Sequence, residues 1–308
     1  MAEDTAPGAT RPTPPEERLV LAGPAGAEPG TDADSTLEQI RLGSLRRCGL
    51  LGTILWTEQT GSTNDLALLL GRQGDVALPA LVICERQTRG RGRGSNRWWS
   101  TSGALTFSLL LSGTPLGLQP ENWSRISLAT GVAICRVVDT LAPVQLRPCR
   151  LRWPNDVYLA DRKLAGILVE GVLPAGEATA STRGRCVVVG IGINVNNSLD
   201  AAPSDVRSRA VALRDVIGYE LDLTGLLLNI LEEFFRLLRE LPHEDSEVVR
   251  EWQERCDLVG RWVKLTTPQG IVRGLCCGIS PTGKLMLRTH RGQVTVTTGW
   301  DLAPTNQD

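Results

Sequence analysis

Residues 85–100 read ERQTRGRGRGSNRWWS, an alternation of arginine and glycine that runs into two tryptophans. An apolar run precedes this stretch at 81–84, and a second one follows it at 105–111. Glycine lets a loop approach a ligand closely, and arginine adds forked donors that suit carboxylate and phosphate. The stretch therefore predicts a loop between two strands that wraps an anionic ligand.

A disordered arginine–glycine segment that binds RNA is the alternative interpretation of the same residues. Such a segment is rarely inserted between two strand-like apolar runs and followed at once by Trp98 and Trp99. The flanking residues favour the structured loop, and a binding test with an RNA oligomer would separate the two interpretations.

The composition is that of an ordinary globular protein, with 308 residues, 42% hydrophobic and 22% charged. A net charge of -1 gives no overall basic field of the kind that attracts nucleic acid. The 8 cysteines form no Cys-x-x-Cys pair, and with only 2 histidines a zinc site is disfavoured. No apolar run is long enough to cross a membrane, and the first residues lack the apolar core of a secretory signal. We expect a cytoplasmic protein whose cysteines are buried and reduced.

The chain divides into three regions by composition. Residues 1–35 are rich in proline, glycine, alanine and threonine and have no apolar period, so we expect a disordered tail without a DNA-binding head. Residues 36–256 mix apolar strands with amphipathic helices, one of which starts near Asn122 or Ser124. Residues 257–308 contain four short strands separated by turn residues, which predicts a small β-barrel.

Polar residues at a predicted helix start form the first candidate site. Ser62 and Thr63 precede the apolar run 66–70 and suit a helix N-terminus. Helix capping alone explains these two residues. A functional interpretation is that the free donors at a helix start can also hydrogen-bond a ligand carbonyl.

Three further features occur later in the chain. Residues 151–159 and 162–170 predict two strands joined by a turn, with Lys163 opening the second. A lysine at a strand start is most often solvated, although its ammonium group could also point into a cleft. Residues 190–194 read GIGIN, which lacks the third glycine of a dinucleotide fingerprint but permits close approach to a flat ligand.

Taken together, these motifs resemble those of the biotin–protein ligases, in their order and spacing. The resemblance rests on STN at 62–64, Gln87 with GRGR at 90–93, WPND at 153–156, RKLAGILVE at 162–170 and GIGIN at 190–194. It runs from about residue 50 to the C-terminus. The fold that it implies is α+β, a central mixed β-sheet flanked by helices as in class II aminoacyl-tRNA synthetases. Residues 36–256 would form this biotin- and ATP-binding catalytic domain, and residues 257–308 an SH3-like β-barrel.

The resemblance also implies a reaction and its residues. Biotin and ATP would be the substrates, with Mg²⁺, and biotinyl-5′-AMP the intermediate. The implied catalytic cations are Arg91, Arg93 and Lys163, which would stabilise charge where two anions meet. The implied biotin-binding residues are Ser62, Thr63, Asn64, Gln87, Arg91, Gly92, Arg93, Trp98, Lys163, Gly166 and Gly190. The implied ATP-binding residues are Arg93, Asn96, Arg152, Asn155, Asp156 and Asn194, with Asp156 also as the Mg²⁺ ligand.

The implied partner is the biotin carboxyl carrier protein, or carrier domain, of acetyl-CoA carboxylase or a related carboxylase. The ligase-only form is implied, with no DNA partner and no membrane, and a homodimer is left open. Two departures stand out: Arg152 replaces a lysine that many members carry, and the end from Thr298 to Pro304 lacks the arginine that touches ATP in many members. A lipoate or octanoate ligase or transferase of the same superfamily is the other enzyme considered.

Overall fold

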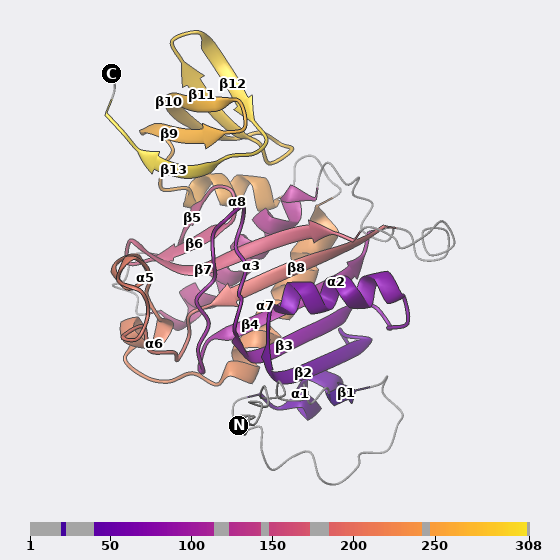
Figure 1. Ribbon diagram of the computed structural model, residues 1–308. Helices are drawn as coiled ribbons and strands as arrows, with labels where there is room; N and C mark the ends of the chain where they lie inside the picture. Colours follow the sequence, from indigo (N-terminus) through magenta and orange to yellow (C-terminus); the bar gives the residue numbers. More distant parts are fainter. Residues whose placement is uncertain are drawn as a thin grey trace, which may run out of the picture.

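The computed structural model describes residues 20–22, 40–113, 123–142, 148–172, 185–241 and 247–306, which are organised around two β-sheets (Figure 1). The larger sheet has eight strands in the order β1-β2-β3-β4-β8-β7-β6-β5. Its strands are β1 (Val20–Ala22), β2 (Thr53–Thr60), β3 (Ala80–Gln87), β4 (Leu105–Ser112), β5 (Arg150–Arg152), β6 (Asp156–Leu159), β7 (Arg162–Gly171) and β8 (Cys186–Ile193). The pair β2–β3 is parallel and the other neighbours pair antiparallel, so the predicted mixed sheet is confirmed.

Helices cover both faces of this sheet. The described helices are α1 (Leu42–Arg47), α2 (Thr63–Gln73), α3 (Ser124–Leu141), α5 (Ser204–Arg209), α6 (Leu213–Ile217), α7 (Leu223–Glu240) and α8 (Glu247–Arg255). On β3, Leu81 and Ile83 belong to the large core with α3 and α7, whereas Ala80 and Val82 belong to a smaller core under α2. Alternate residues of a strand point to opposite faces, so both faces are buried and the central strands read as continuous apolar runs.

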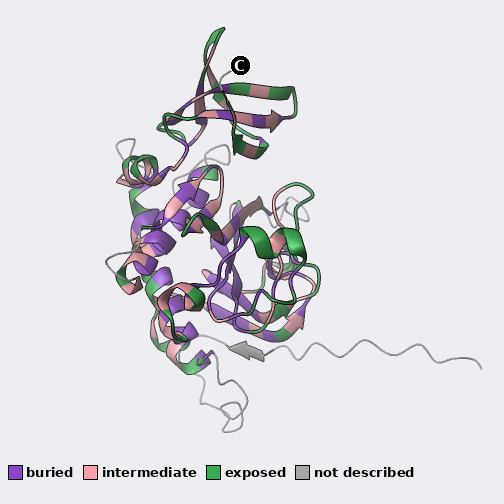
Figure 2. Ribbon diagram, turned by 90° about the vertical axis from the view of Figure 1, so that its left-hand side faces the viewer, coloured by how far each residue is buried: buried purple, intermediate pink, exposed green. Residues whose placement is uncertain are grey.

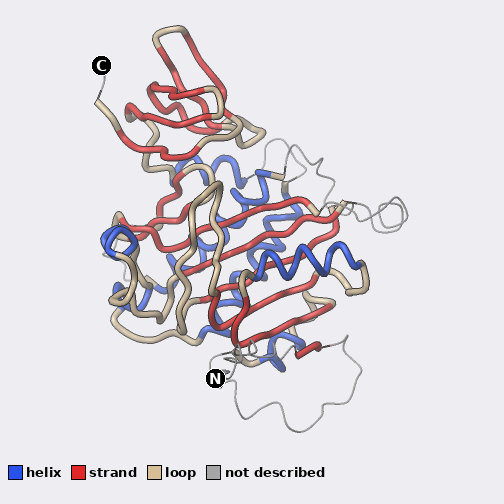
Figure 3. The backbone as a smooth tube through the Cα atoms, in the orientation of Figure 1, coloured by secondary structure: helices blue, strands red, loops and turns tan. Residues whose placement is uncertain are grey.

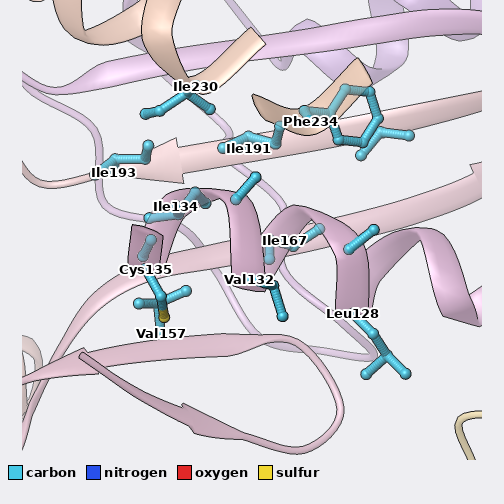
Figure 4. Close-up of a cluster of buried hydrophobic side chains, with 14 of the residues drawn as sticks. Leu128, Val132, Ile134, Cys135, Val157, Ile167, Ile191, Ile193, Ile230 and Phe234 are labelled. Atoms are coloured by element: carbon cyan, nitrogen blue, oxygen red, sulfur yellow. The ribbon is translucent and has the colours of Figure 1, made fainter. Parts of the chain in front are cut away.

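The large core lies between the sheet and the helices α3 and α7. Figure 4 shows Val132 and Ile134 of α3, Ile191 of β8, and Ile230 and Phe234 of α7 gathered in this layer. Figure 2 shows that the buried residues are concentrated on the strands and helices at the centre of the molecule. None of the described helices is both long and apolar enough to cross a membrane.

The second sheet is antiparallel, with the strand order β12-β11-β10-β9-β13, and is consistent with the predicted SH3-like barrel. Figure 3 shows it as a separate group of strands at one end of the molecule. Its strands are β9 (Trp262–Thr267), β10 (Gly270–Ile279), β11 (Leu285–Thr289), β12 (Gly292–Val296) and β13 (Trp300–Pro304). The fifth strand, β13, was not predicted, because its pairing with β9 shifts register between Trp300 and Ala303 and Asp301 has a φ of 55°. Such a bulge interrupts the alternation by which strands are found in a sequence.

The N-terminal region departs from expectation at one point. Val20–Ala22, inside the predicted disordered tail, form β1 and pair antiparallel with β2. The prediction is wrong for these three residues, because even a short apolar segment can add to a sheet edge through its backbone. The remainder of 1–35 and the alternative helix start at Asn122 lie outside the described residues, and α3 begins at Ser124.

Candidate active site

The segment between β3 and β4, residues 88–104, is the arginine–glycine loop, and it crosses one face of the large sheet toward the C-terminal sheet (Figure 1). The loop is folded, as predicted: Trp98 N donates to Gly90 O at 3.0 Å and Gly92 N donates to Asn96 O at 2.8 Å. Together with the start of α2 and the strands β4, β6, β7 and β8, it encloses a cavity of about 100 Å³. This volume is below the roughly 300 Å³ of typical ligand pockets.

The cavity brings together all of the predicted site residues except Arg152 and Asn194. It is lined by Ser62, Thr63, Asn64, Gln87, Arg91, Gly92, Arg93, Asn96, Arg97, Trp98, Thr106, Asn155, Asp156, Lys163, Gly166, Ile167, Leu168, Gly190, Ile191 and Gly192.

Two glycines of β8 form the floor, because no larger residue fits there. A Cβ on Gly190 would lie 1.9 Å from Asn64 Oδ1, and one on Gly192 would lie 2.3 Å from Trp98 Cε2. The GIGIN motif therefore lets the start of α2 and the Trp98 indole rest directly on the sheet. The buried Trp98 Nε1 has no hydrogen-bond partner among the described residues.

Buried hydroxyl and amide groups gather at the inner end of the cavity, at the start of α2. Gln87 Oε1 accepts from Thr63 N at 2.7 Å and from Thr63 Oγ1 at 3.1 Å. Ser108 Oγ, on β4, lies 2.6 Å from Asn64 Oδ1 and 2.7 Å from Thr63 Oγ1, and its single proton is donated to one of these two oxygens. Ser62 occupies the predicted N-cap position, but its side chain makes no cap hydrogen bond. Simple capping therefore does not explain this serine, which lines the cavity.

The cations of the site differ in how they are neutralised. Arg91 donates to both carboxylate oxygens of Glu170, at 2.9 and 2.6 Å, and its Nη2 lies 2.9 Å from Asp65 Oδ1. The hydrogen bond with Glu170 raises the pKa of the Arg91 guanidinium. Lys163 Nζ lies 2.7 Å from Asp156 Oδ1. Both of these cations are therefore matched by carboxylates before any ligand binds.

Arg93 is held by neutral groups instead. Its Nη1 donates to Gly299 O at 3.1 Å, its Nη2 donates to Thr298 Oγ1, and its Cζ lies 5.6 Å from the centre of the Trp153 ring. No carboxylate pairs with Arg93 within the part of the chain that the structure describes. Burial lowers the pKa of its guanidinium, which as an arginine still keeps its charge at neutral pH. Arg93 thus places an unneutralised positive charge at the cavity.

The residues around this cavity coincide with a region that known ligases share. The model of the biotin/lipoate A/B protein ligase family matches residues 56–194. The biotin–[acetyl-CoA-carboxylase] ligase of Mycobacterium tuberculosis is 30% identical over 242 residues, which cover 78% of this chain and 85% of that protein. The chain belongs to the biotin/lipoate A/B protein ligase family.

Two further relatives support the assignment to this family. The bifunctional ligase/repressor BirA of Bacillus spizizenii is 32% identical over 215 residues, covering 69% of this chain. The chain spans 62% of the length of that relative. The structure of a biotin protein ligase from Aquifex aeolicus in complex with biotin and ATP is similar with a TM-score of 0.67 and 28% identity. That likeness covers 82% of this chain and 99% of the Aquifex chain.

Arg152 and Asn194 lie away from the cavity. Arg152 pairs with Asp257, and its guanidinium lies 4.0 Å from the centre of the Tyr158 ring. The side chain of Asn194 accepts from Asn197 Nδ2 at 3.1 Å and is buried. Other side chains of the protein therefore engage Arg152 and Asn194 outside the cavity, and their predicted contacts with ATP remain predictions.

Sequence reasoning missed Glu170 and Ser108. Glu170 follows Gly166 and Leu168 at intervals of two on β7, and both of those residues line the cavity. The strand period of two would have placed Glu170 on the same face. Ser108 lies within the apolar run 105–111, which was predicted only as a strand that follows the loop. Its polarity inside a fully buried strand was the available signal, since buried hydroxyls require partners.

Proposed function

We propose that the protein is an ATP-dependent biotin–protein ligase. The observation that carries the proposal is that one cavity has two chemically different ends, one lined by neutral polar groups and the other by cations. The inner end offers the buried groups of Ser62, Thr63, Asn64 and Gln87, which suit the two N–H groups and the carbonyl of a ureido ring. The outer end offers the cations Arg93 and Lys163, which suit a carboxylate meeting a phosphate.

In the first half-reaction a biotin carboxylate oxygen attacks the α-phosphorus of ATP. A new oxygen–phosphorus bond forms, the bond to the β-phosphate breaks, and pyrophosphate leaves with the electron pair, giving biotinyl-5′-AMP. Lys163 and Arg93 stabilise the negative charge that gathers where the two anions meet. Without ligand, Lys163 forms an ion pair with Asp156 at 2.7 Å. When biotin binds, Lys163 exchanges this carboxylate for that of the ligand.

In the second half-reaction a carrier lysine amine attacks the acyl carbon of the mixed anhydride. The carbon–oxygen bond to phosphate breaks, AMP leaves, and the amine loses its proton. Arg91, which Glu170 and Asp65 neutralise, serves chiefly to anchor the arginine–glycine loop beside the bound ligand. Its predicted catalytic role remains a prediction.

The residues fit Mg²⁺ only as an ion that arrives with the nucleotide. Asp156 is the carboxylate that would hold it, and no group of three or more His, Cys, Asp or Glu side chains suited to a metal occurs in the described ranges. Nucleotide-bound Mg²⁺ needs one or two protein carboxylates, because phosphates and water supply the other ligands. When bound, it neutralises phosphate charge.

We infer that the acceptor is the biotin carboxyl carrier domain of acetyl-CoA carboxylase or a related carboxylase. The 30% identity to a biotin–[acetyl-CoA-carboxylase] ligase supports this inference. A cytoplasmic location is supported by the 8 cysteines, all of which are free. The net charge of -1 supports the absence of a DNA partner, and a gel shift that persists at physiological salt would contradict that part of the proposal.

A ligase for lipoate would use the same cations, but lipoate has no ureido ring for the inner polar groups to recognise. The test is pyrophosphate release without a carrier. We expect release to require both ATP and biotin, with lipoate giving at most a small fraction of the rate. Equal release with lipoate would favour the other enzyme, and stabilisation by an RNA oligomer alone in a thermal-shift assay would favour the binding module.

A further inference from the structure

The contact between Arg93 and the turn Thr298–Gly299 joins two distant parts of the chain. Arg93 lies in the arginine–glycine loop, whereas the turn connects β12 to β13 in the C-terminal sheet. The guanidinium donates to Gly299 O at 3.1 Å and to Thr298 Oγ1. A cation of the proposed catalytic machinery is therefore held by the second sheet.

The turn offers a fixed acceptor. Gly299 is buried, and a Cβ there would lie 2.7 Å from Leu265 Cδ1 and 2.8 Å from Thr266 O. The backbone of the turn consequently packs against β9 with no room to spare, which fixes the position of the Gly299 carbonyl.

The same sheet also fixes the ring beside Arg93. Trp153 is buried, with 4% of its surface exposed, and its Nε1 donates to Gly283 O at 3.1 Å. Gly283 belongs to the turn between β10 and β11. Two separate turns of the C-terminal sheet thus hold the arginine and the aromatic ring against which it lies, 5.6 Å from the ring centre.

The acceptors on this turn are neutral, and this matters for charge. Glu170 and Asp65 cancel much of the charge of Arg91, and Asp156 that of Lys163. A hydroxyl and a carbonyl orient the Arg93 guanidinium without cancelling its charge. Stabilisation of a transition state requires such an oriented, uncompensated donor before the reaction begins.

We propose that Thr298 and the Gly299 carbonyl are positioning groups for Arg93. Through them, the C-terminal sheet contributes to the rate of the first half-reaction. The catalytic consequence rests on the proposed function, whereas the ordering of the loop does not. The C-terminal sheet thus contributes by orienting Arg93 of the loop. Its own segment from Thr298 to Pro304 contains no arginine.

The test compares Thr298→Ala with Thr298→Ser, which keeps the hydroxyl, and with Thr297→Ala. Thr297 is the exposed neighbour on the same turn and takes no part in the site. The first readout is trypsin cleavage after the loop arginines 89, 91, 93 and 97 in the absence of ligands, followed by mass spectrometry. The second is pyrophosphate release, resolved into kcat and the KM for biotin.

Loss of one hydrogen bond to a charged group should speed loop cleavage of Thr298→Ala about 3- to 10-fold and lower kcat by a similar factor. The KM for biotin should change less than about twofold, since the inner end of the cavity is untouched. Thr298→Ser should behave like the wild type, as should Thr297→Ala.

Cleavage and kcat in Thr298→Ala equal to those in Thr297→Ala would overturn the proposal. A kcat loss that Thr298→Ser does not restore would also overturn it, because that pattern indicates a general disturbance of the turn. Failure of the proposed function is distinguishable: the wild type would then release no pyrophosphate, while the cleavage rates would still report on the contact.

Discussion

Arg91 and Glu170 meet at two points, with Nη1 2.9 Å from Oε1 and Nη2 2.6 Å from Oε2. The same carboxylate accepts from Asn64 Nδ2 at 2.7 Å. One acidic residue on β7 therefore ties the arginine–glycine loop to the start of α2, across the cavity that both elements line. Paired and hydrogen-bonded in this way, Glu170 orders the inner part of the site before ligand arrives.

Replacing Glu170 by glutamine should weaken biotin binding. The amide of Glu170→Gln keeps one acceptor, so Arg91 loses the two-point pair and Asn64 loses a charged partner. We expect calorimetry to show about a 10-fold rise in the Kd for biotin. The effect should be smaller than for a fully buried charged pair, because Glu170 is partly exposed to solvent. The control is Glu58→Gln, an exposed position on β2. Equal affinities for both variants would show that Glu170 does not order the site.

Gly192→Ala should disturb both stability and ligand binding. The new methyl group would lie 2.3 Å from Trp98 Cε2, so the indole must leave its place on the sheet. Overpacking of this kind typically costs about 1–3 kcal/mol, which urea unfolding can measure. Gly43→Ala is the matched control, because its methyl would meet only the flexible end of Arg47 at 3.3 Å. A loss no larger than in Gly43→Ala would mean that Trp98 does not depend on this glycine.

Lys163→Ala and Arg93→Gly should fail in different ways. Lys163→Ala removes charge at the reacting carboxylate, so pyrophosphate release should fall by ~10² or more while biotin binding weakens far less. Arg93→Gly should instead loosen the loop over the intermediate, which then escapes and labels lysines of a bystander protein. Adenylate formation should partly survive in Arg93→Gly, because Lys163 still addresses the carboxylate. Promiscuous labelling by Lys163→Ala, together with no pyrophosphate release by Arg93→Gly, would invert these roles.

Acid should destabilise the fold through the charged network between α3, α7 and α8. Arg136 Nη1 lies 2.8 Å from Glu233 Oε1, and Arg136 also pairs with Glu247. Hydrogen bonds from Arg236 and Arg136 lower the pKa of Glu233, and those from Arg136 lower the pKa of Glu247. Because folded-state pKa values are depressed, the stabilisation is present above the unfolded value of about 4.3 and is lost as the pH falls through the folded values.

The variant Arg136→Met tests this network. It should lower the free energy of unfolding at pH 7 by about 1–3 kcal/mol, since partly buried carboxylates lose their partner. It should also lose less stability than the wild type between pH 7 and pH 3.5. Arg239→Met, at an exposed position on α7, serves as the control. If the free energy of unfolding fell equally with pH in Arg136→Met and in the wild type, this network would not account for the acid destabilisation.

Local patterns predicted the parts of this site that are local in sequence. The arginine–glycine stretch and its apolar flanks predicted the loop between β3 and β4. GIGIN predicted close approach to a flat ligand, which stays a prediction, and in the structure Asn64 and the Trp98 indole lie against these glycines. Long-range partners were beyond such patterns. Asp257, which engages Arg152, lies 105 residues later, and Thr298, which holds Arg93, lies 205 residues later. Contacts of that range depend on how the two sheets are placed, and no local pattern encodes this.

The most direct test of the proposed function is the intact mass of a biotin carboxyl carrier domain after incubation with the enzyme, ATP, Mg²⁺ and equal amounts of biotin and lipoate. The proposed function predicts a mass increase of one biotinyl group per carrier, located on a single lysine, which disappears when ATP is omitted. An unmodified carrier known to be competent, or one that carries a lipoyl group, would contradict it.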